Sequence, residues 1–577
     1  MSIVVLRSSS SLAFLLMGAI ALGVPCRSVA QGFPTDAATH CAIEPAKIAS
    51  WFETGSVSLN GAVKPANSVT FPDSPNCSFY EWAEQMFLWL NSPTPGGGGH
   101  VFTSPGFFGV SPPDVNKKRT LIPQTSQAIT MQVRNAQTGP NDLPLIVDRK
   151  GRLMEVQPPR FGPNGGRLLA LAPGKVVELG RLAMGANGKP VFFDGQGKPV
   201  SPKPGFAELN AKAPGTRAIP PVFKFVLDNK AVFLDANDNV VDVEQGQAGG
   251  DSVLMSQQGS LVYYALHVND VLAYFATAVN SGVMTPAPTA FPTAQPELDK
   301  IVAFAQQHSK QVSNPQTLAI ELKTSWVEAT GLDLSKYVTM TATVPTYDKS
   351  DPAHLKWSHS GTKSIQLAMV GMHVVGSTKG HPEMIWATFE HVDNAPLAAY
   401  SYLNKSGQVI SVPQESTGKW VFAASGSKGP FNVERMSFFA PDIRASNGNT
   451  ISASDTLRWK AWGAASDKSP NPFAGSPAAS NSQVIAANAS VIGQLPPGDV
   501  RRNYVMTGAT WTKPGTSPDD EANQVGTNQL ANSTMETYRQ SFDTLSNPDN
   551  NCFACHTTNT TRVSRIFKGL LPLPLGK

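Results

Sequence analysis

The chain is poor in charged residues, in cysteine and in long apolar runs. Charged side chains make up 15% of its 577 residues, and the 46 basic residues nearly balance the 42 acidic ones. Such a balance offers no strongly basic surface to nucleic acid or to an anionic membrane, so neither is expected as a partner. No run of about eighteen apolar residues follows the N-terminal segment 1–30, which excludes a later membrane-spanning helix.

Several catalytic motifs are also missing. The sequence has no Gly-x-Ser-x-Gly, no His-Glu-x-x-His, no dinucleotide-binding glycine fingerprint and no calcium-binding loop. The glycines at 96–99 are not followed by the Gly-Lys-Ser or Gly-Lys-Thr of a phosphate-binding loop. The enzyme classes that these motifs define are therefore not indicated.

Residues 1–30 have the pattern of a secretory signal peptide. Arg7 gives a positive start, the segment 12–24 is apolar, and Ser-Val-Ala at 28–30 is a small-x-small cleavage site. We therefore expect export, with the periplasm of a Gram-negative bacterium as the simplest compartment and no membrane anchor after cleavage. Cleavage would leave 44 basic and 42 acidic residues, so the mature chain stays nearly neutral.

A lipid on Cys26 and an uncleaved anchor are the two alternatives for this segment. The residues before Cys26, Gly-Val-Pro at 23–25, lack the small residue that usually precedes a lipidated cysteine. The apolar run at 12–24 is also short for a membrane span. Both observations favour a cleaved signal peptide.

The sequence near the C-terminus contains the attachment signature of c-type haem, Cys-x-x-Cys-His, at residues 552–556. Two thiols at this spacing reach the two vinyl groups of the porphyrin, and the adjoining imidazole ligates the iron axially. The motif predicts one covalent haem c, bound by Cys552 and Cys555 with His556 as the proximal ligand. A thioredoxin-like redox pair and a zinc site are the alternatives. The preceding segment 546–551 is typical of a turn rather than a strand, and no further zinc ligands lie nearby at matching spacing.

The remaining cysteines suggest a disulfide. If Cys552 and Cys555 bind haem, Cys41 and Cys77 are left as a pair in the mature chain. Because an exported protein meets an oxidising compartment, we expect these two cysteines to form a disulfide bond.

The sixth ligand of the iron is left open by the sequence. Only 21 residues follow His556, and they contain no Met, His or Cys. The ligand therefore comes from upstream, or the position is open or bound by water. Met535, on the apolar face of a predicted helix at 528–542, is the nearest candidate. His373 and His391 are the long-range candidates, and core packing is the alternative role for Met535.

Apolar patterning and turn residues predict an α+β, β-rich fold, with a large antiparallel-β body, scattered helices and a short C-terminal helical haem-binding segment. The expected domains are a signal peptide at 1–30, a β-rich body with an N-terminal helical segment at 31–500, and a C-terminal haem segment at 501–577. Helices are predicted at 43–52, 78–90, 269–280, 297–308 and 528–542. Strand pairs are predicted at 144–148 with 152–156, 190–194 with 198–200, 223–227 with 231–234, and 365–375 with 384–392. A strand leading into a helical turn is expected at 318–328, β and loop at 397–499, and a strand at 501–512.

Two strands of this body contain histidine. His373 and His391 lie in the predicted strands 365–375 and 384–392, and alternation places Phe389 and His391 on one side and Trp386 and Glu390 on the other. Strand histidines are more often hydrogen-bonded structural residues than ligands.

We interpret three other polar residues of the predicted strands as structural rather than functional. His267 is expected to pack in the core. Glu321 and Lys323 fall on one face if extended, and we expect an ordinary surface pair.

Four blocks of the sequence carry a family resemblance. They are residues 77–90, 247–271, 370–394, and 530–537 together with the terminal Cys-x-x-Cys-His. The chain resembles, over most of its mature length, a family of large exported bacterial monohaem c-type cytochrome proteins with a C-terminal haem motif. This resemblance implies haem attachment and export but no substrate, and it transfers a role only to Cys552, Cys555 and His556.

Three functions are compatible with these features. The first is a periplasmic haem protein that exchanges single electrons with a redox partner protein. The second is a haem enzyme, such as a peroxidase-like oxidoreductase, with an open iron and a distal His373 or His391. The third is a haem-based binder or sensor of a small-molecule ligand.

Overall fold

The computed structural model describes residues 32–72, 76–94, 98–114, 118–124, 129–131, 133, 137–138, 144–148, 153–157, 167–172, 175–185, 189–201, 220–227, 230–241, 243–244, 252–439, 441–446, 449–463, 475–527, 529–540, 552–556 and 558–575. The predicted signal peptide lies outside these residues. In the part of the chain that is described, no helix is both long and apolar enough for a bilayer crossing.

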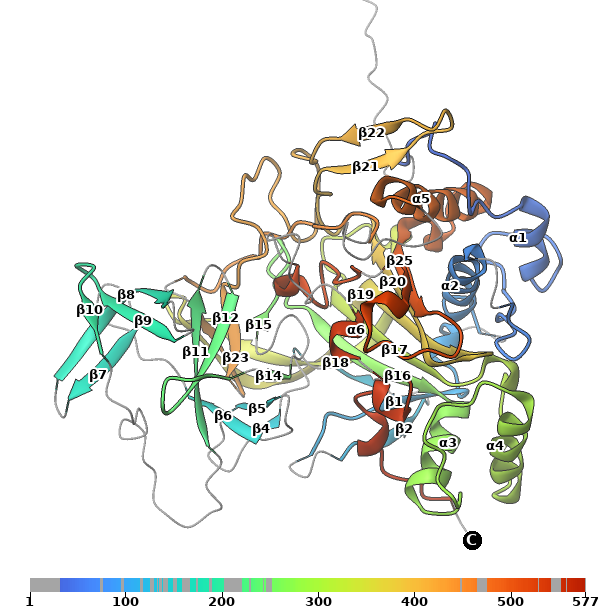
Figure 1. Cartoon of the computed structure of the whole chain (residues 1–577), viewed down its shortest axis with the longest axis horizontal. Coiled ribbons are helices and arrows are strands. Elements are labelled where there is room, and N and C mark those ends of the chain that lie inside the picture. The colour runs from blue at the N-terminus through green and yellow to red at the C-terminus, as the bar shows by residue number, and fades with distance from the viewer. Residues whose placement is uncertain are drawn as a thin grey trace, which may run out of the picture.

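A large curved sheet forms the body of the molecule (Figure 1). Thirteen described strands belong to it, and all but one of their pairings are antiparallel. They are β1 (Phe107–Val110), β2 (Leu121–Pro123), β3 (Ile129–Thr130), β15 (Ser252–Val253), β16 (Tyr263–Asn269), β17 (Ile320–Glu328), β18 (Thr339–Asp348), β19 (Lys356–Thr378), β20 (His381–His391), β23 (Met436–Phe439), β24 (Asp442–Ala445), β25 (Tyr504–Thr512) and β26 (Gln524–Gly526). The central order is β1-β16-β17-β19-β20-β25. The β-rich α+β fold expected from the sequence is confirmed.

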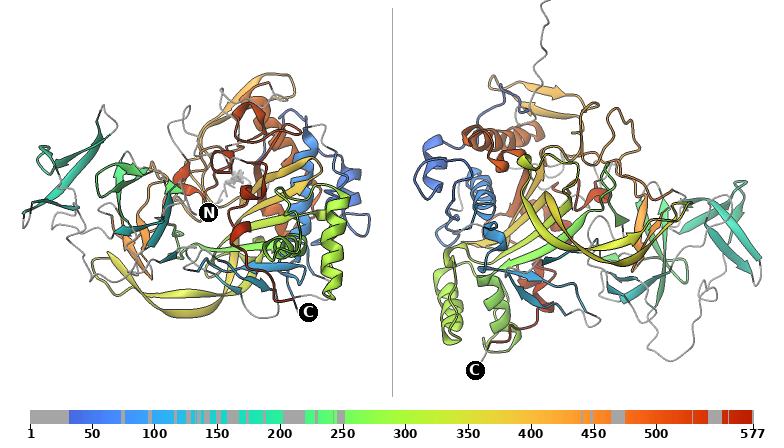
Figure 2. Two further views of the ribbon diagram at one scale, coloured as in Figure 1. Left: turned by 60° about the horizontal axis from the view of Figure 1, so that its bottom comes forward. Right: turned by 180° about the vertical axis from the view of Figure 1, so that it is seen from behind.

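A smaller β lobe extends from this body, on the left in Figure 1 and on the right when seen from behind in Figure 2. One of its sheets contains β4 (Gln137–Thr138), β5 (Pro144–Asp148), β6 (Leu153–Gln157), β11 (Pro221–Leu227), β12 (Lys230–Asp235), β13 (Val240–Val241) and β14 (Val243–Glu244). The other contains β7 (Leu168–Ala172), β8 (Lys175–Met184), β9 (Pro190–Asp194) and β10 (Pro199–Val200). The predicted hairpins in this region are confirmed. A buried ion pair between Lys224 Nζ and Glu434, at 2.7 Å, joins β11 to the chain just before β23.

Helices pack against the body sheet. They are α1 (Pro45–Trp51), α2 (Cys77–Leu90), α3 (Asp270–Asn280), α4 (Gln295–Gln307) and α5 (Pro477–Gln494), with the short α6 (Cys552–Cys555) near the C-terminus. Shorter 3-10 turns are η2 (Val101–Thr103), η5 (Pro315–Thr317), η6 (Leu334–Lys336), η7 (Val500–Asn503), η8 (Glu521–Asn523), η9 (Thr537–Arg539), η11 (Thr561–Val563) and η12 (Phe567–Gly569). A separate hairpin, β21 (Tyr400–Leu403) with β22 (Val409–Val412), lies beside α5.

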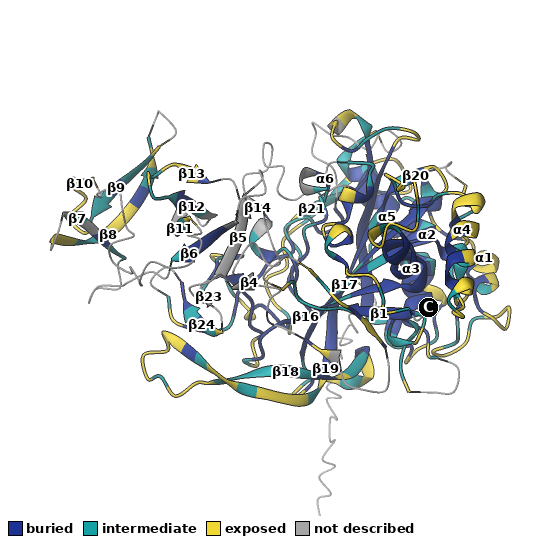
Figure 3. Cartoon of the chain, turned by 90° about the horizontal axis from the view of Figure 1, so that it is seen from below, coloured by how far each residue is buried: buried dark blue, intermediate teal, exposed yellow. Residues whose placement is uncertain are grey.

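Two predicted helices follow directly from local sequence. The apolar residues of α2 recur at helical spacing, and Phe79, Trp82, Met86 and Leu90 are all buried. α3 begins where Asn269 ends β16, because the Asn269 side chain accepts a hydrogen bond from the Leu272 N–H and caps the helix. Figure 3 shows that α2 and α3 are largely buried against the sheet.

The sequence predictions were wrong at three places. α5 lies in a region expected to be β and loop. It begins at a Ser476 cap, and its weakly patterned Ser, Asn and Ala residues are buried by packing on α2 and β25 rather than selected by periodicity. The described residues 529–540 of the predicted helix at 528–542 form turns and η9 instead. There Asn532 Oδ1 accepts from the N–H groups of Thr534 and Met535 and competes with helical bonding.

The third difference is at β17, which stays extended to Glu328 because β16 and β19 pair with it on both sides.

β25, in the predicted C-terminal segment, pairs with β20 of the predicted body, so residues on both sides of position 500 build one sheet.

Within α2, Glu84 is a buried carboxyl that must take up a proton when the chain folds at neutral pH. Its Oε1 has no hydrogen-bond partner among the described residues, and burial raises its pKa to about 8. Because the unfolded pKa is lower, the folded state loses stability as pH rises from about 4.5 toward 8. We predict that Glu84→Gln raises the free energy of unfolding by about 2 kcal/mol at pH 7, measured by urea unfolding.

The matched control is Glu81→Gln on the same helix, where the carboxylate forms a partly exposed ion pair with Lys47. It should change the free energy of unfolding by less than about 1 kcal/mol. The effect of Glu84→Gln should disappear near pH 4, and a gain that persisted there would refute the charge explanation.

Candidate functional site

One face of the central strands lies under residues 529–540, 552–556 and 558–575, which we call the C-terminal segment from here on. Figure 1 shows this segment in red in front of the strands. The register pairs Lys323 of β17 with His373 of β19, and His373 with Thr388 of β20, so the three side chains form a row. Alternate residues on the same strands extend this row. We call the set the polar face: Glu321, Lys323, Ser325, Gly371, His373, Val375, Trp386, Thr388 and Glu390.

Hydrogen bonds attach the C-terminal segment to each of these strands. Ser564 Oγ donates to Glu321 Oε2 at 2.6 Å on β17. The Ser533 N–H donates to Glu390 Oε1 at 2.9 Å on β20. The His373 ring of β19 bonds Glu536. The segment is therefore positioned by directional polar contacts.

The opposite face of the same strands is apolar and is covered by α2. Phe87 of α2 stacks on Phe389 with ring centroids 4.2 Å apart. His391 also lies on this side, stacked on Tyr337 at 3.9 Å, and its Nε2 lies 3.1 Å from the Lys336 carbonyl oxygen. Burial lowers the pKa of His391 to about 3, so it is a neutral core residue. The predicted separation of Phe389 and His391 from Trp386 and Glu390 is confirmed.

The Cys-x-x-Cys-His motif forms one helical turn beside the polar face. α6 spans Cys552–Cys555, and the His556 N–H donates to the Cys552 carbonyl at 3.0 Å. Cys552 is half-buried and Phe553 is buried. The Trp386 ring lies against His556, with centroids 4.1 Å apart, and edge-on to Phe553.

The His556 ring is held in one tautomer. Its Nδ1 lies 2.6 Å from the Val563 carbonyl oxygen, which can only accept, so Nδ1 carries the proton and donates. Burial lowers the pKa of His556 to about 3; the Val563 bond opposes this shift, while the Arg565 and Lys323 charges add to it. At neutral pH the ring is therefore uncharged, with its lone pair on Nε2.

The carbonyl that orients His556 belongs to a fixed segment. On either side of Val563, the Thr561 N–H donates to the Thr289 carbonyl at 2.8 Å and Ser564 bonds Glu321. Further on, Phe567 packs against Phe275 with ring centroids 5.2 Å apart. The residues after the motif thus form a rigid support for the imidazole.

A half-buried ionic cluster lies on the same face. Glu536 bonds Lys323 Nζ at 2.9 Å and His373 Nε2 at 3.0 Å, while His373 Nδ1 lies 2.8 Å from Thr388 Oγ1. Burial alone would raise the pKa of Glu536, but the neighbouring His373 and Lys323 outweigh it and hold that pKa well below its usual range. Glu536 also acts electrostatically on His556, so the cluster and the motif share one environment.

The structure thus brings some sequence candidates together and separates others. His373 lies on the polar face, and so does Met535, which is fully buried and near Gly371. His391 lies across the sheet. His267 is a buried core residue, as predicted, with Nδ1 3.0 Å from Gln124 Nε2.

The residues that sequence reasoning missed are those whose partners are distant. Glu321 and Lys323 do not form the expected surface pair, because the C-terminal segment covers them through Ser564 and Glu536. Val563 contributes only a backbone carbonyl and leaves no signal in the side-chain pattern. Alternation along β20 places Trp386 on the face away from α2, as observed. It gives no sign that Trp386 contacts His556.

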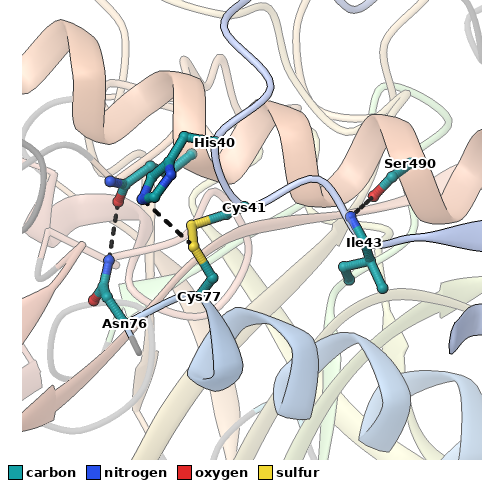
Figure 4. The surroundings of a disulfide bond; sticks show 7 residues. His40, Cys41, Ile43, Asn76, Cys77 and Ser490 are labelled. Carbon is teal, nitrogen blue, oxygen red and sulfur yellow. Dashed lines mark hydrogen bonds between the residues drawn. A yellow bond between two sulfur atoms is a disulfide. The ribbon is translucent and has the colours of Figure 1, made fainter. Parts of the chain in front are cut away.

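The predicted disulfide between Cys41 and Cys77 is present, with Cα atoms 4.9 Å apart (Figure 4). His40 Nε2 and the two sulfur atoms lie within 4.8 Å of one another. Sulfur in a disulfide is not a thiolate, so this group does not bind a metal in its oxidised form.

Comparisons of the chain with known protein families, with characterised proteins and with solved structures find no match.

Glu390 anchors the start of the C-terminal segment by an ion pair inside the protein. Its carboxylate receives hydrogen bonds from Arg458, Asn394 and Ser533, and both ionic side chains are almost fully buried. Glu390→Gln would leave Arg458 buried without its counter-charge. We predict a loss of about 3 kcal/mol in the free energy of unfolding, together with faster amide hydrogen exchange at 533–537.

The matched control is Glu328→Gln, which removes a carboxylate from the partly exposed pair with Lys363. It should cost less than about 1 kcal/mol and leave exchange at 533–537 unchanged. Equal losses in the two variants would contradict the anchoring role of Glu390.

Proposed function

We propose that the chain is an exported c-type haem protein that passes single electrons to or from a periplasmic redox partner protein. The observation that carries the proposal is the hydrogen bond from His556 Nδ1 to the Val563 carbonyl, directly after the two-cysteine turn α6. It leaves Nε2 as the nitrogen that would coordinate an iron, and it orients the ring. Ligating histidines are commonly held in this way.

The donor set fits a c-type haem. Cys552 and Cys555 would hold the group through thioether bonds, and His556 would be its proximal ligand. The bound group would supply an iron that gains and loses one electron. The protein supplies orientation and surroundings: Trp386 and Phe553 pack around the imidazole, and Val563 fixes its tautomer.

Two further features support export to the periplasm. Thioether attachment of haem takes place outside the cytoplasm, where residues 1–30 would direct the chain. The Cys41–Cys77 disulfide is typical of an oxidising compartment. These features agree with the motif but are independent of it.

A second candidate function is favoured by the ionic cluster on the polar face. His373, bonded to Glu536 and Thr388, is a side chain that could accept or donate a proton close to the motif. A haem enzyme of the peroxidase-like kind, or a binder of small ligands, would use such a residue beside an open iron. Electron transfer is preferred because Ser533, Glu536 and Ser564 are hydrogen-bonded to the central strands. Both ring nitrogens of His373 also already have partners.

The first test is covalent haem retention. We predict that mature protein made with a haem c maturation system carries one haem by intact mass and by its pyridine haemochrome spectrum. Cys552→Ser and His556→Ala should each lower the retained haem severely, because each removes a bond to the group. His359→Ala, at an exposed histidine of β19, is the control and should retain haem fully. Haem-free wild-type protein would overturn the proposal.

The second test separates the two candidate functions. For electron transfer we predict a low-spin, six-coordinate ferric spectrum that changes little when cyanide is added. A high-spin spectrum with rapid cyanide binding would instead favour the second candidate. In that case, His373→Ala should slow peroxide turnover while covalent haem is retained.

A further inference from the structure

The disulfide lies at the start of a long helix, away from the C-terminal motif. Cys77 is the first residue of α2, which has 14 residues, and Cys41 belongs to the N-terminal segment that passes beside the start of this helix (Figure 4). The partial positive charge at a helix N-terminus stabilises a thiolate at such a position. The first turn of α2 contains no acidic residue to cancel this effect.

The side chain before Cys77 leaves that charge available. Asn76 makes no capping hydrogen bond to α2, and its Nδ2 donates instead to Gln483 Oε1 at 3.1 Å. Figure 4 shows this amide turned toward α5, away from the sulfur. The field of the helix therefore acts directly on Cys77.

An imidazole is the second group that acts on this sulfur. His40 Nε2 lies 3.6 Å from Cys77 Sγ, and Figure 4 shows the ring directed at the disulfide. A histidine beside a cysteine at a helix N-terminus is the arrangement that makes thiols reactive in proteins. His40 is exposed to solvent.

The two cysteines differ in exposure and in backbone conformation. Cys77 is half-buried, whereas Cys41 is buried with 8% of its surface exposed. The φ of Cys41 is +70°, in the left-handed region that a non-glycine residue rarely adopts. Such backbone strain often occurs at functional sites.

The chain on both sides of Cys41 stays attached to the body without the disulfide. The Ala38 N–H donates to the Leu403 carbonyl at 2.8 Å, and the Ile43 N–H donates to Ser490 Oγ of α5 at 2.9 Å. Broken sulfurs would therefore remain neighbours, as a reversible exchange requires.

We propose that Cys41–Cys77 is a thiol–disulfide exchange site for a thiol reductant, with Cys77 as the exchanging sulfur and Cys41 as the resolving one. A thiolate attacks Cys77 Sγ and forms a mixed disulfide, while the Cys41–Cys77 bond breaks and Cys41 takes up a proton. A second thiolate attacks the sulfur of the first thiol and expels Cys77 as a thiolate. Two thiols thus become one disulfide, and two electrons reduce the protein.

The helix N-terminus and His40 act in the second step. Both stabilise the thiolate that leaves, and a better leaving group exchanges faster. In the reverse direction they raise the thiolate fraction of Cys77, which then attacks an external disulfide. This site does not depend on haem binding, so the inference stands or falls separately from the proposed function.

The test uses folded, full-length mature protein and reduced glutathione as the probe. We predict that the disulfide opens while the fold persists by circular dichroism, and that peptide mapping finds the mixed disulfide on Cys77. In reduced protein, His40→Ala should slow alkylation of Cys77 at pH 7 by about fivefold to tenfold. His308→Ala, a half-buried histidine at the end of α4, is the control and should not change this rate.

Two results would overturn the inference. One is a disulfide that glutathione and dithiothreitol reduce only after the protein unfolds, which would mean a purely structural bond. The other is an alkylation rate of Cys77 that His40→Ala leaves unchanged in protein that remains folded.

Discussion

Alternation along three neighbouring strands is the constraint on which the rest of the structure depends. β17, β19 and β20 are covered on both faces, but by different partners. One face packs aromatic side chains such as Phe389 against α2, and the other presents Lys323, His373 and Thr388 to the C-terminal segment. A shift of one residue in register would exchange these faces and bury the ionic residues beneath α2, so the register is strongly fixed.

Placing charged groups between the sheet and the C-terminal segment is costly unless each has a partner. Glu536 is stabilised by Lys323 and His373, and Glu390 by Arg458 and Ser533. Apolar packing alone would tolerate several positions of a loop. Directional ionic contacts leave few alternatives, because any other position leaves a buried charge without a partner. The place of the motif is thus set by ionic contacts together with apolar packing, such as that of Phe567 on Phe275.

Local patterns in the sequence predicted the elements well, and the distant contacts poorly. The periodicity of α2, the Asn269 cap of α3 and the alternation of β20 each depend on nearby residues, and each was read correctly. The helix expected at 528–542 does not form, because Asn532 Oδ1 accepts from the backbone N–H groups of Thr534 and Met535 and Glu536 pairs with Lys323 on β17. α5 has too little apolar contrast for periodicity to reveal it. Of the site, the motif was visible, but the support from Val563 and Trp386 arises only from tertiary structure.

Residues 558–575, which follow the Cys-x-x-Cys-His motif, attach it to the body of the protein. The Val563 carbonyl orients His556, while Thr561 and Ser564 form hydrogen bonds to the body. The strands supply the remaining surroundings through Trp386 and the ionic cluster. The motif is therefore supported by strands whose residues lie far from it in the sequence.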